Sequence, residues 1–189
     1  MVLTQMLEDV INFTETPINE ANFTEECRKE LEQKGVVTLH NFLKPETIKE
    51  LVHEAKSHSG LAYFTNSTHN VYLTPRNETL SPEHVFNRQL TSSKGCITTD
   101  QIPEASKLKK LYFSDIFKKF ICRVVGETDL YEYADPLSSI NVHYAAKGQE
   151  LNWHFDNSKF AITLLLQAPE SGGHFEYVSN LRNAEKNEM

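Results

Sequence analysis

The sequence predicts an α+β fold in which helices come first and antiparallel strands follow. Apolar residues recur at helical spacing in the regions 45–60 and 106–126, whereas from residue 138 onward short apolar and β-branched segments alternate with turn residues. With 189 residues, 39% hydrophobic and 24% charged, the chain is typical of one soluble domain. Helices followed by strands predict a sheet sandwich or open barrel with helices on one side.

The region before residue 61 contains the first expected elements. We expect a helix over 25–35 that Gly35 stops, then a strand over the β-branched segment 36–43. Pro45 favours the first turn of a second helix, which ends near Gly60. Four apolar residues of that helix follow the i, i+3, i+4, i+7 pattern: Ile48, Leu51, Val52 and Ala55.

The middle of the chain alternates irregular and helical patterns. Residues 61–101 are polar and rich in Pro, Asn, Ser and Thr, a composition typical of a lid or binding loop, with a possible strand at 94–102. One or two helices are expected over 106–126, with Ser114 or Asp115 as an N-cap. Their buried stripe would consist of Ile116, Phe117, Phe120, Ile121 and Val124.

The C-terminal part is predicted to be the β core of a single domain. Residues 1–130 form a mainly helical N-terminal part with a few strands, and 131–189 carry the core. Its expected strands, separated by turns at 147–148, 157–158 and 171–173, are 138–146, 150–156, 160–167 and 174–180.

Charge and cysteine content exclude several classes of partner. The net charge is −7 and basic residues occur at most in pairs, so we expect neither nucleic acid nor an anionic membrane as a partner. No segment is long and apolar enough to span a membrane, and the acidic N-terminus does not resemble a signal peptide. Three widely spaced cysteines favour reduced thiols. We therefore expect a cytoplasmic protein that acts on a small molecule; its oligomeric state is left open.

His154 and Asp156 form the pair most suggestive of chemistry. Alternate residues of a strand point to the same face, so the two side chains would lie together, with Trp153 and Phe155 on the other face. An imidazole and a carboxylate are two of the three ligands in the 2-His-1-carboxylate triad that holds non-haem Fe(II). A His-X-Asp triplet alone is common, and it also fits a structural hydrogen bond.

The surrounding sequence resembles the Fe(II)/2-oxoglutarate-dependent oxygenase superfamily. The stretches "HNVYLTP", "YADPL", "INV", "WHFDNSKFAITLLLQAPESGG" and "FEYV" are similar to the subgroup of radical halogenases and hydroxylases acting on free amino acids. This resemblance implies a double-stranded β-helix, a jelly-roll or cupin-like core, preceded by helices. It also implies Fe(II) held by His154 and Asp156, with 2-oxoglutarate and O₂ as co-substrates.

Three further residues are candidates for binding the co-substrate. Tyr144 lies ten residues before His154, a position from which members of the superfamily hydrogen-bond 2-oxoglutarate; the alternative is a core tyrosine bonded to the backbone. Thr163 and Gln167 share the mixed face of segment 160–167, which would line the cavity because buried polar groups need a partner.

Asp156 also bears on the type of reaction. In the halogenases of this subgroup a small residue replaces the carboxylate, which lets chloride bind the iron. This chain keeps Asp156, so the resemblance implies C–H hydroxylation of a small polar substrate such as a free amino acid.

The resemblance also implies a second histidine ligand and an arginine for 2-oxoglutarate, both beyond the segment that Gly172 and Gly173 open. No histidine follows His174. His174 and His143 are expected to point away from the site, and the other five histidines, His69 among them, lie outside the strand core. We therefore expect a C-terminally truncated domain that lacks its late core strands: a truncated gene product, a fragment, or a short form that binds iron poorly. Two alternatives stay open, a catalytically inactive binding protein and an unrelated β-sandwich with a structural His-Asp pair.

Overall fold

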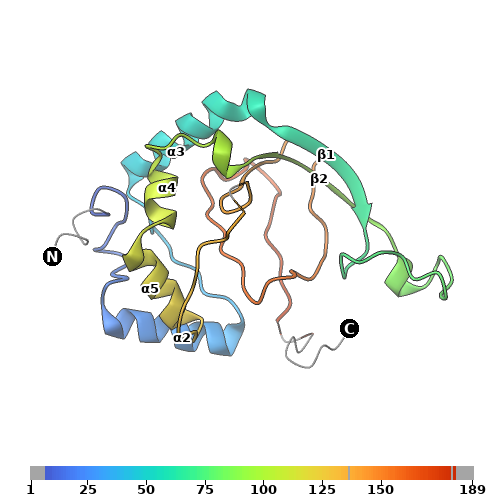
Figure 1. The fold of residues 1–189 in the computed structure, drawn as a ribbon, viewed down its shortest axis with the longest axis horizontal. Helices are drawn as coiled ribbons and strands as arrows, with labels where there is room; N and C mark the ends of the chain where they lie inside the picture. Colours follow the sequence, from blue (N-terminus) through green and yellow to red (C-terminus); the bar gives the residue numbers. More distant parts are fainter. Residues whose placement is uncertain (1–6, 136, 180, 182–189) are drawn as a thin grey trace.

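The computed structural model describes residues 7–135, 137–179 and 181. Figure 1 shows the helices at one end and a long two-stranded ribbon arching away from them, with the C-terminal part of the chain running beneath the arch. The helices are α2 (Ala21–Lys34), α3 (Pro45–His58), α4 (Lys107–Tyr112) and α5 (Asp115–Val124), and the strands are β1 (Tyr63–His69), β2 (Leu90–Ile97) and β3 (Val142–Tyr144). Short 3₁₀ turns cover Ser59–Leu61, Val85–Asn87 and Thr99–Gln101.

The helices follow the local signals of the sequence. Helix α2 ends at Gly35, whose φ of 74° is left-handed and whose N–H donates to the carbonyl of Leu31, so a residue without Cβ suits the position. Helix α3 begins with Pro45, as predicted. In α5, Phe120 and Val124 are buried, and Ile116, Phe117 and Ile121 pack beside them at the edge of the core.

The main core lies among these helices and the N-terminal segment. Leu7, Val10 and Ile11 are fully buried, and they pack with residues of α3 and α5. The buried hydroxyl of Thr47 in α3 donates to the carbonyl of Asp9 at 2.9 Å, and the carboxylate of Asp9 accepts from Lys110 of α4 at 2.6 Å. The N-terminal segment therefore joins helices that are distant in the sequence.

The sheet is antiparallel, in the order β1-β2-β3. Tyr63 pairs with Cys96, and Cys96 pairs with His143. On the other face the ring of Phe64 covers Gly95, where a Cβ would come within 2.6 Å of it. Near β3 a second core cluster contains Ile97, Ile102 and Ile140, with Val142 and Tyr144 packed against it.

Two predicted strands in the first half of the chain differ from the structure. Residues 36–43 are not a strand: only Leu43 pairs, in an isolated bridge to Ile11, and Asn41 has a positive φ of 54°. The strand expected at 94–102 begins earlier, at Leu90, and ends at Ile97. Its partner β1 lies within the region expected to be irregular. Polar residues form this strand because β2 supplies backbone partners along its whole length.

The predicted C-terminal strands are largely wrong within the described residues. Of the segment 138–146 only Val142–Tyr144 is a strand, and 150–156, 160–167 and 174–179 are irregular. No hydrogen bond joins the backbone of 160–179 to another described residue. Alternating apolar residues form a strand only where a neighbouring strand takes up their N–H and C=O groups.

The described residues contain one three-stranded sheet, so the fold is α+β, and the jelly-roll core stays a prediction. No helix in the described part of the chain is long and apolar enough to cross a membrane.

Candidate functional site

The side chains of His154 and Asp156 converge. Their Nε2 and Oδ1 atoms are 3.5 Å apart, although the segment that carries them is not a strand. Asn152, with a positive φ of 57°, turns the chain just before the pair, and its carbonyl lies 2.9 Å from Nδ1 of His154. The predicted convergence is confirmed, and a local turn produces it in place of the expected pleat.

The hydrogen bond to Asn152 decides which nitrogen of His154 is free. A carbonyl oxygen can only accept, so Nδ1 carries the proton that bonds to Asn152. Nε2 faces a carboxylate oxygen of Asp156: in the protonated ring it donates to that oxygen, and in the neutral ring it carries a lone pair. In the neutral state the two side chains offer a nitrogen and an oxygen ligand to a cation, and adjacent ligands on a divalent metal lie about 3 Å apart, given metal–ligand bonds of roughly 2.1 Å.

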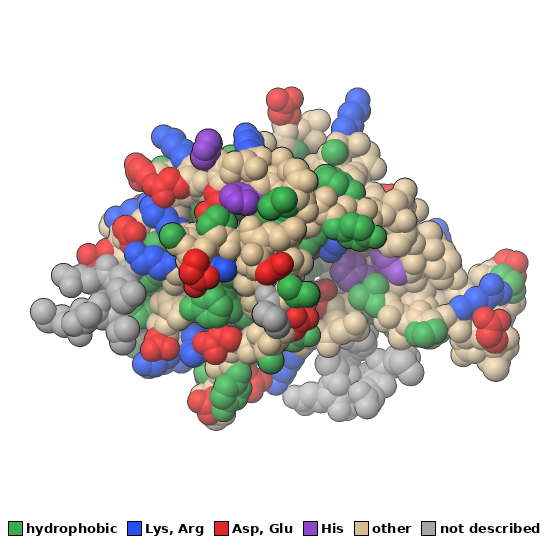
Figure 2. Space-filling view, turned by 45° about the horizontal axis from the view of Figure 1, so that its top comes forward, with side chains coloured by type: hydrophobic (Ala, Val, Ile, Leu, Met, Phe, Trp, Pro, Cys, Tyr) green, Lys and Arg blue, Asp and Glu red, His purple; other side chains and the backbone are tan. Residues whose placement is uncertain are grey.

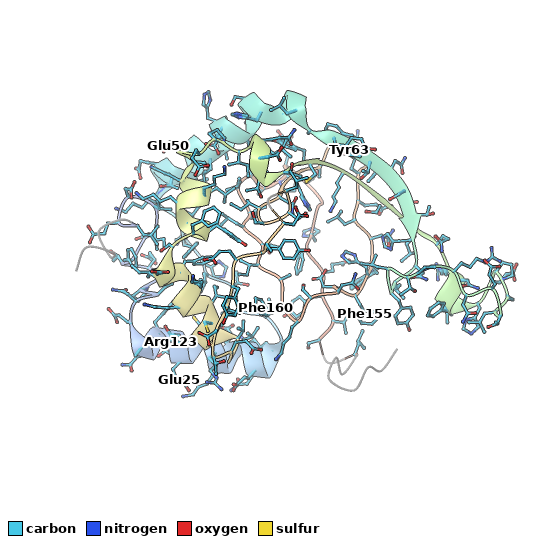
Figure 3. All side chains as sticks on the ribbon, in the orientation of Figure 1. Glu25, Glu50, Tyr63, Arg123, Phe155 and Phe160 are labelled. Atoms are coloured by element: carbon cyan, nitrogen blue, oxygen red, sulfur yellow. The ribbon has the colours of Figure 1, made fainter. Side chains whose placement is uncertain are left out.

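The loop that follows β1 holds the His-X-Asp segment in place. The N–H of Phe155 donates to the carbonyl of Val71 at 2.8 Å. The ring of Tyr72 stacks on Phe155 at 5.6 Å and on Phe86 at 5.1 Å, which makes a three-ring stack. Figure 3 shows Phe155 below the far end of the β1–β2 arch, where the loop begins.

Two buried asparagines give this loop its shape. The Oδ1 of Asn70 accepts from the N–H groups of Tyr72 and Thr74, and its Nδ2 donates to the carbonyl of Thr74. Asn87 donates to the carbonyls of Asn77, Leu80 and Ser81 and accepts from the N–H of Asn77. Because both amides are buried and bonded on both sides, the loop is internally braced.

The structure also brings His69, which the sequence placed outside the site, against His154. The two rings meet edge to face with centroids 5.7 Å apart. The nitrogens of His69 face the carbonyls of Asn70 and Leu151 at 2.9 and 3.3 Å. Figure 2 shows histidine side chains gathered at a recess beside the projecting loop, which is the segment between β1 and β2. No spacing signal predicts this contact, because it depends on how β1 ends.

The predicted co-substrate residues lie elsewhere in the structure. Tyr144 donates its hydroxyl to the carbonyl of Ala55 in α3 at 2.6 Å, and burial raises the pKa of the phenol. Thr163 and Gln167 are exposed on a segment that is not a strand. No described hydrogen bond joins Tyr144, Thr163 or Gln167 to His154 or Asp156. The bond to Ala55 favours the structural alternative for Tyr144, and the co-substrate roles of Thr163 and Gln167 stay predictions.

The remaining histidines of the C-terminal half do not complete a metal site. His143 sits opposite Cys96 in the sheet; partial burial lowers the pKa of its imidazole, and the nearby Lys94 lowers it further. His174 is exposed. Within the described ranges, no group of three His, Cys, Asp or Glu side chains is arranged to hold a metal ion. The structure therefore shows a convergent pair with an adjacent histidine.

Comparison with known proteins finds a family. The family described as Halogenase D matches residues 19–189, which include the second core cluster, the loop after β1 and the His154–Asp156 pair, whereas Leu7, Val10, Ile11 and Ile18 of the main core cluster lie before the matched range. No curated protein and no solved structure matches the chain. Because the match spans most of the sequence, the chain belongs to the Halogenase D family.

Proposed function

We propose that this protein is an Fe(II)/2-oxoglutarate-dependent oxygenase that hydroxylates a C–H bond of a small polar substrate such as a free amino acid. The observation that carries the proposal is the 3.5 Å approach of His154 Nε2 to Asp156 Oδ1, with Nδ1 of the same ring bonded to a carbonyl. Family membership supports an enzyme of the halogenase type, and the carboxylate argues for oxygen transfer within that type.

The two side chains fit two neighbouring positions of an Fe(II) site. Imidazole nitrogen and carboxylate oxygen are ligands that Fe(II) accepts. The hydrogen bond from Nδ1 of His154 to the carbonyl of Asn152 orients the ring so that Nε2 is the nitrogen available to a metal. When bound with 2-oxoglutarate, Fe(II) supplies the activation of O₂ that C–H oxidation needs. The contribution of the protein is to hold the two side chains in place. Phe155 lies between them in the sequence, its N–H donates to the carbonyl of Val71, and its ring stacks on Tyr72.

Asp156 supports hydroxylation over halogenation. A carboxylate oxygen directed at the same point as His154 Nε2 would take the metal position that a halide needs. We expect the protein, supplied with Fe(II), 2-oxoglutarate, chloride and a panel of amino acids, to give products heavier by one oxygen. Mass spectra dominated by a chlorine isotope pattern would show that Asp156 does not take that position.

Metal binding tests the central claim directly. Co(II), a spectroscopic substitute for Fe(II), is titrated into the protein under nitrogen and followed by visible absorption. We expect His154→Ala and Asp156→Asn to weaken binding sharply, because each removes one of the two converging donors. His53→Ala, on the exposed face of α3, is the matched control and should bind as the wild type does. Equal binding by Asp156→Asn would refute the ligand assignment.

A catalytically inactive binding protein is the second candidate. The observation that favours it is that, in the part of the chain that the structure describes, the pair has no third ligating side chain. Succinate formation separates the two candidates. Metal binding without succinate, across the amino-acid panel, would support the inactive form.

A further inference from the structure

Strand β1 leaves one edge of the sheet open. The strand order is β1-β2-β3, so β1 has a neighbouring strand on one side only. Within the ranges that the structure describes, the backbone of β1 bonds to β2 and to no other segment. In Figure 1, β1 forms the outer rim of the arch and β2 its inner side. The outward N–H and C=O groups of β1 are therefore available to another strand.

The register shows which residues of β1 face this edge. The N–H of Ser93 in β2 donates to the carbonyl of Glu150 at 2.7 Å, which is on the side of β2 away from β1. Asn66 pairs with Ser93, so the N–H and C=O of Asn66 point away from β2, toward the open edge. Phe64 and Thr68, two residues to either side, share this orientation. All three residues are exposed.

The usual protections of a strand edge are missing from β1. Edges are commonly blocked by charged residues, by proline, by a bulge or by a very short strand. Strand β1 has seven residues, none of them charged or proline, and it pairs with β2 residue for residue. It lies within residues 57–75, the longest stretch of the sequence without Asp, Glu, Lys or Arg. Two copies of a chain with a net charge of −7 can therefore meet here without like-charge repulsion.

A second copy of β1 is complementary to this edge. A two-fold axis at Asn66 places Phe64 of one copy opposite Thr68 of the other, so the outward groups of both strands exchange about six backbone hydrogen bonds. The ring of Phe64, 54% exposed, then packs beside a β-branched side chain. On the other face Tyr63, 76% exposed, lies opposite His69. The full length of the strand is used, and no charged side chains oppose each other.

We infer that β1 joins two copies of this chain by antiparallel pairing about a two-fold axis at Asn66, so that one sheet continues from β3 of one copy to β3 of the other. The inference goes beyond the proposed function and needs neither metal nor substrate. A single strand pair buries less surface than a standard interface of about 1,600 Å², so the expected dissociation constant is on the order of micromolar.

Opposite charges at the axis test this arrangement. Asn66→Lys and Asn66→Glu each set like charges against one another, and sedimentation equilibrium of the full chain should show dimers at least about tenfold weaker than those of the wild type. An equimolar mixture of the two variants should associate again, because Lys then faces Glu. Thr91→Lys, the matched control, adds the same charge at an exposed position of β2, one strand away from the edge, and should dimerise as the wild type does. Far-ultraviolet circular dichroism should be the same for all variants.

Amide exchange gives a second readout that depends on the register. In NMR spectra recorded at low and at high protein concentration, the amides of Phe64, Asn66 and Thr68 should exchange more slowly at the high concentration, because the second copy accepts from them. The amides of Thr65 and Ser67 face β2 and should be protected at both concentrations.

Three results would each overturn the inference: the charges at Asn66 leave the dimer unchanged, the mixture of the two variants fails to associate, or the outward amides exchange alike at both concentrations. The same holds if Leu165→Ser combined with Phe175→Ser, which changes the exposed apolar segment 160–179, abolishes all association. None of these results touches the proposed metal pair, which the Co(II) titration tests separately.

Discussion

At the scale of single residues, a positive φ at Asn152 and the hydrogen bonds of Asn70 determine the backbone conformation around the site. Asn152 turns the chain at a positive φ, so that its carbonyl reaches His154. The side chain of Asn70, a residue that is 1% exposed, makes four hydrogen bonds that fold the loop back at Val71, and the carbonyl of Val71 accepts from Phe155. Hydrogen bonds around these residues therefore position the His154–Asp156 pair indirectly.

Asn70→Ala should weaken both the fold and the site. Truncation leaves the N–H groups of Tyr72 and Thr74 without their acceptor, a loss of about 1 to 3 kcal/mol in the free energy of unfolding. The loosened loop should also lower Co(II) affinity. Urea denaturation and the Co(II) titration measure the two effects. Asn66→Ala, the same change on the exposed part of β1, is the control, and an equal loss there would contradict the role of Asn70.

Tyr144→Phe distinguishes a structural tyrosine from one that binds the co-substrate. The hydroxyl donates to Ala55 at 2.6 Å, so its removal should cost about 1 kcal/mol of stability by loss of one hydrogen bond. The affinity for 2-oxoglutarate, measured by calorimetry on the metal-loaded protein, should stay unchanged. A clear loss of that affinity at unchanged stability would favour the co-substrate role.

At the scale of elements, the helical end and the C-terminal segment meet at the end of α2. Gly35 adopts a left-handed conformation there, and a Cβ added to it would lie 2.7 Å from Cβ of Ser179. Leu164 and Leu166 pack against the helical core from the same segment. The C-terminal segment is therefore seated on the helices at several points, although it forms no strand.

Gly35→Ala should destabilise the protein by about 1 kcal/mol or more, because a residue with Cβ is strained at positive φ and the new methyl meets Ser179. Chemical denaturation followed by circular dichroism measures the change. Gly60→Ala is the matched control: no atom lies within 4 Å of a Cβ placed there, and its φ is not positive. If both variants lost the same free energy of unfolding, neither the positive φ of Gly35 nor its close approach to Ser179 would contribute to stability.

At the scale of the whole molecule, polar and apolar surfaces are unevenly distributed. The helical end buries its apolar residues, whereas segment 160–179 exposes many of its own, among them Ile162, Leu165, Phe175, Tyr177 and Val178. The rings of Phe175 and Tyr177 contact each other. Exposed apolar side chains on a segment with unpaired backbone favour association with another chain.

We expect the 189-residue chain to self-associate as its concentration rises. Leu165→Ser combined with Phe175→Ser should reduce this association, because these side chains are 73% and 77% exposed and apolar. Sedimentation velocity over a concentration series measures it. Val85→Ser, at a side chain that is 75% exposed on the projecting loop, should have no effect. A monomer at every concentration would contradict the expectation.

Elements with local signals could be predicted from the sequence. Helices α2, α3 and α5 follow from apolar spacing, from Gly35 and from Pro45, since a helix makes its hydrogen bonds within four residues. The convergence of His154 and Asp156 could be predicted from their separation by one residue, although the turn at Asn152, and not a strand, produces it. Family membership agrees with the resemblance of the sequence to halogenases and hydroxylases.

Only the tertiary structure decided which segments pair and what surrounds the site. Strand β1 forms because β2 lies beside it, whereas 160–167, with a stronger apolar pattern, has no described partner and stays irregular. The contact of His69 with His154 depends on where β1 ends. Strand pairs and pockets join residues far apart in the chain, and their formation depends on loop geometry that no local pattern encodes.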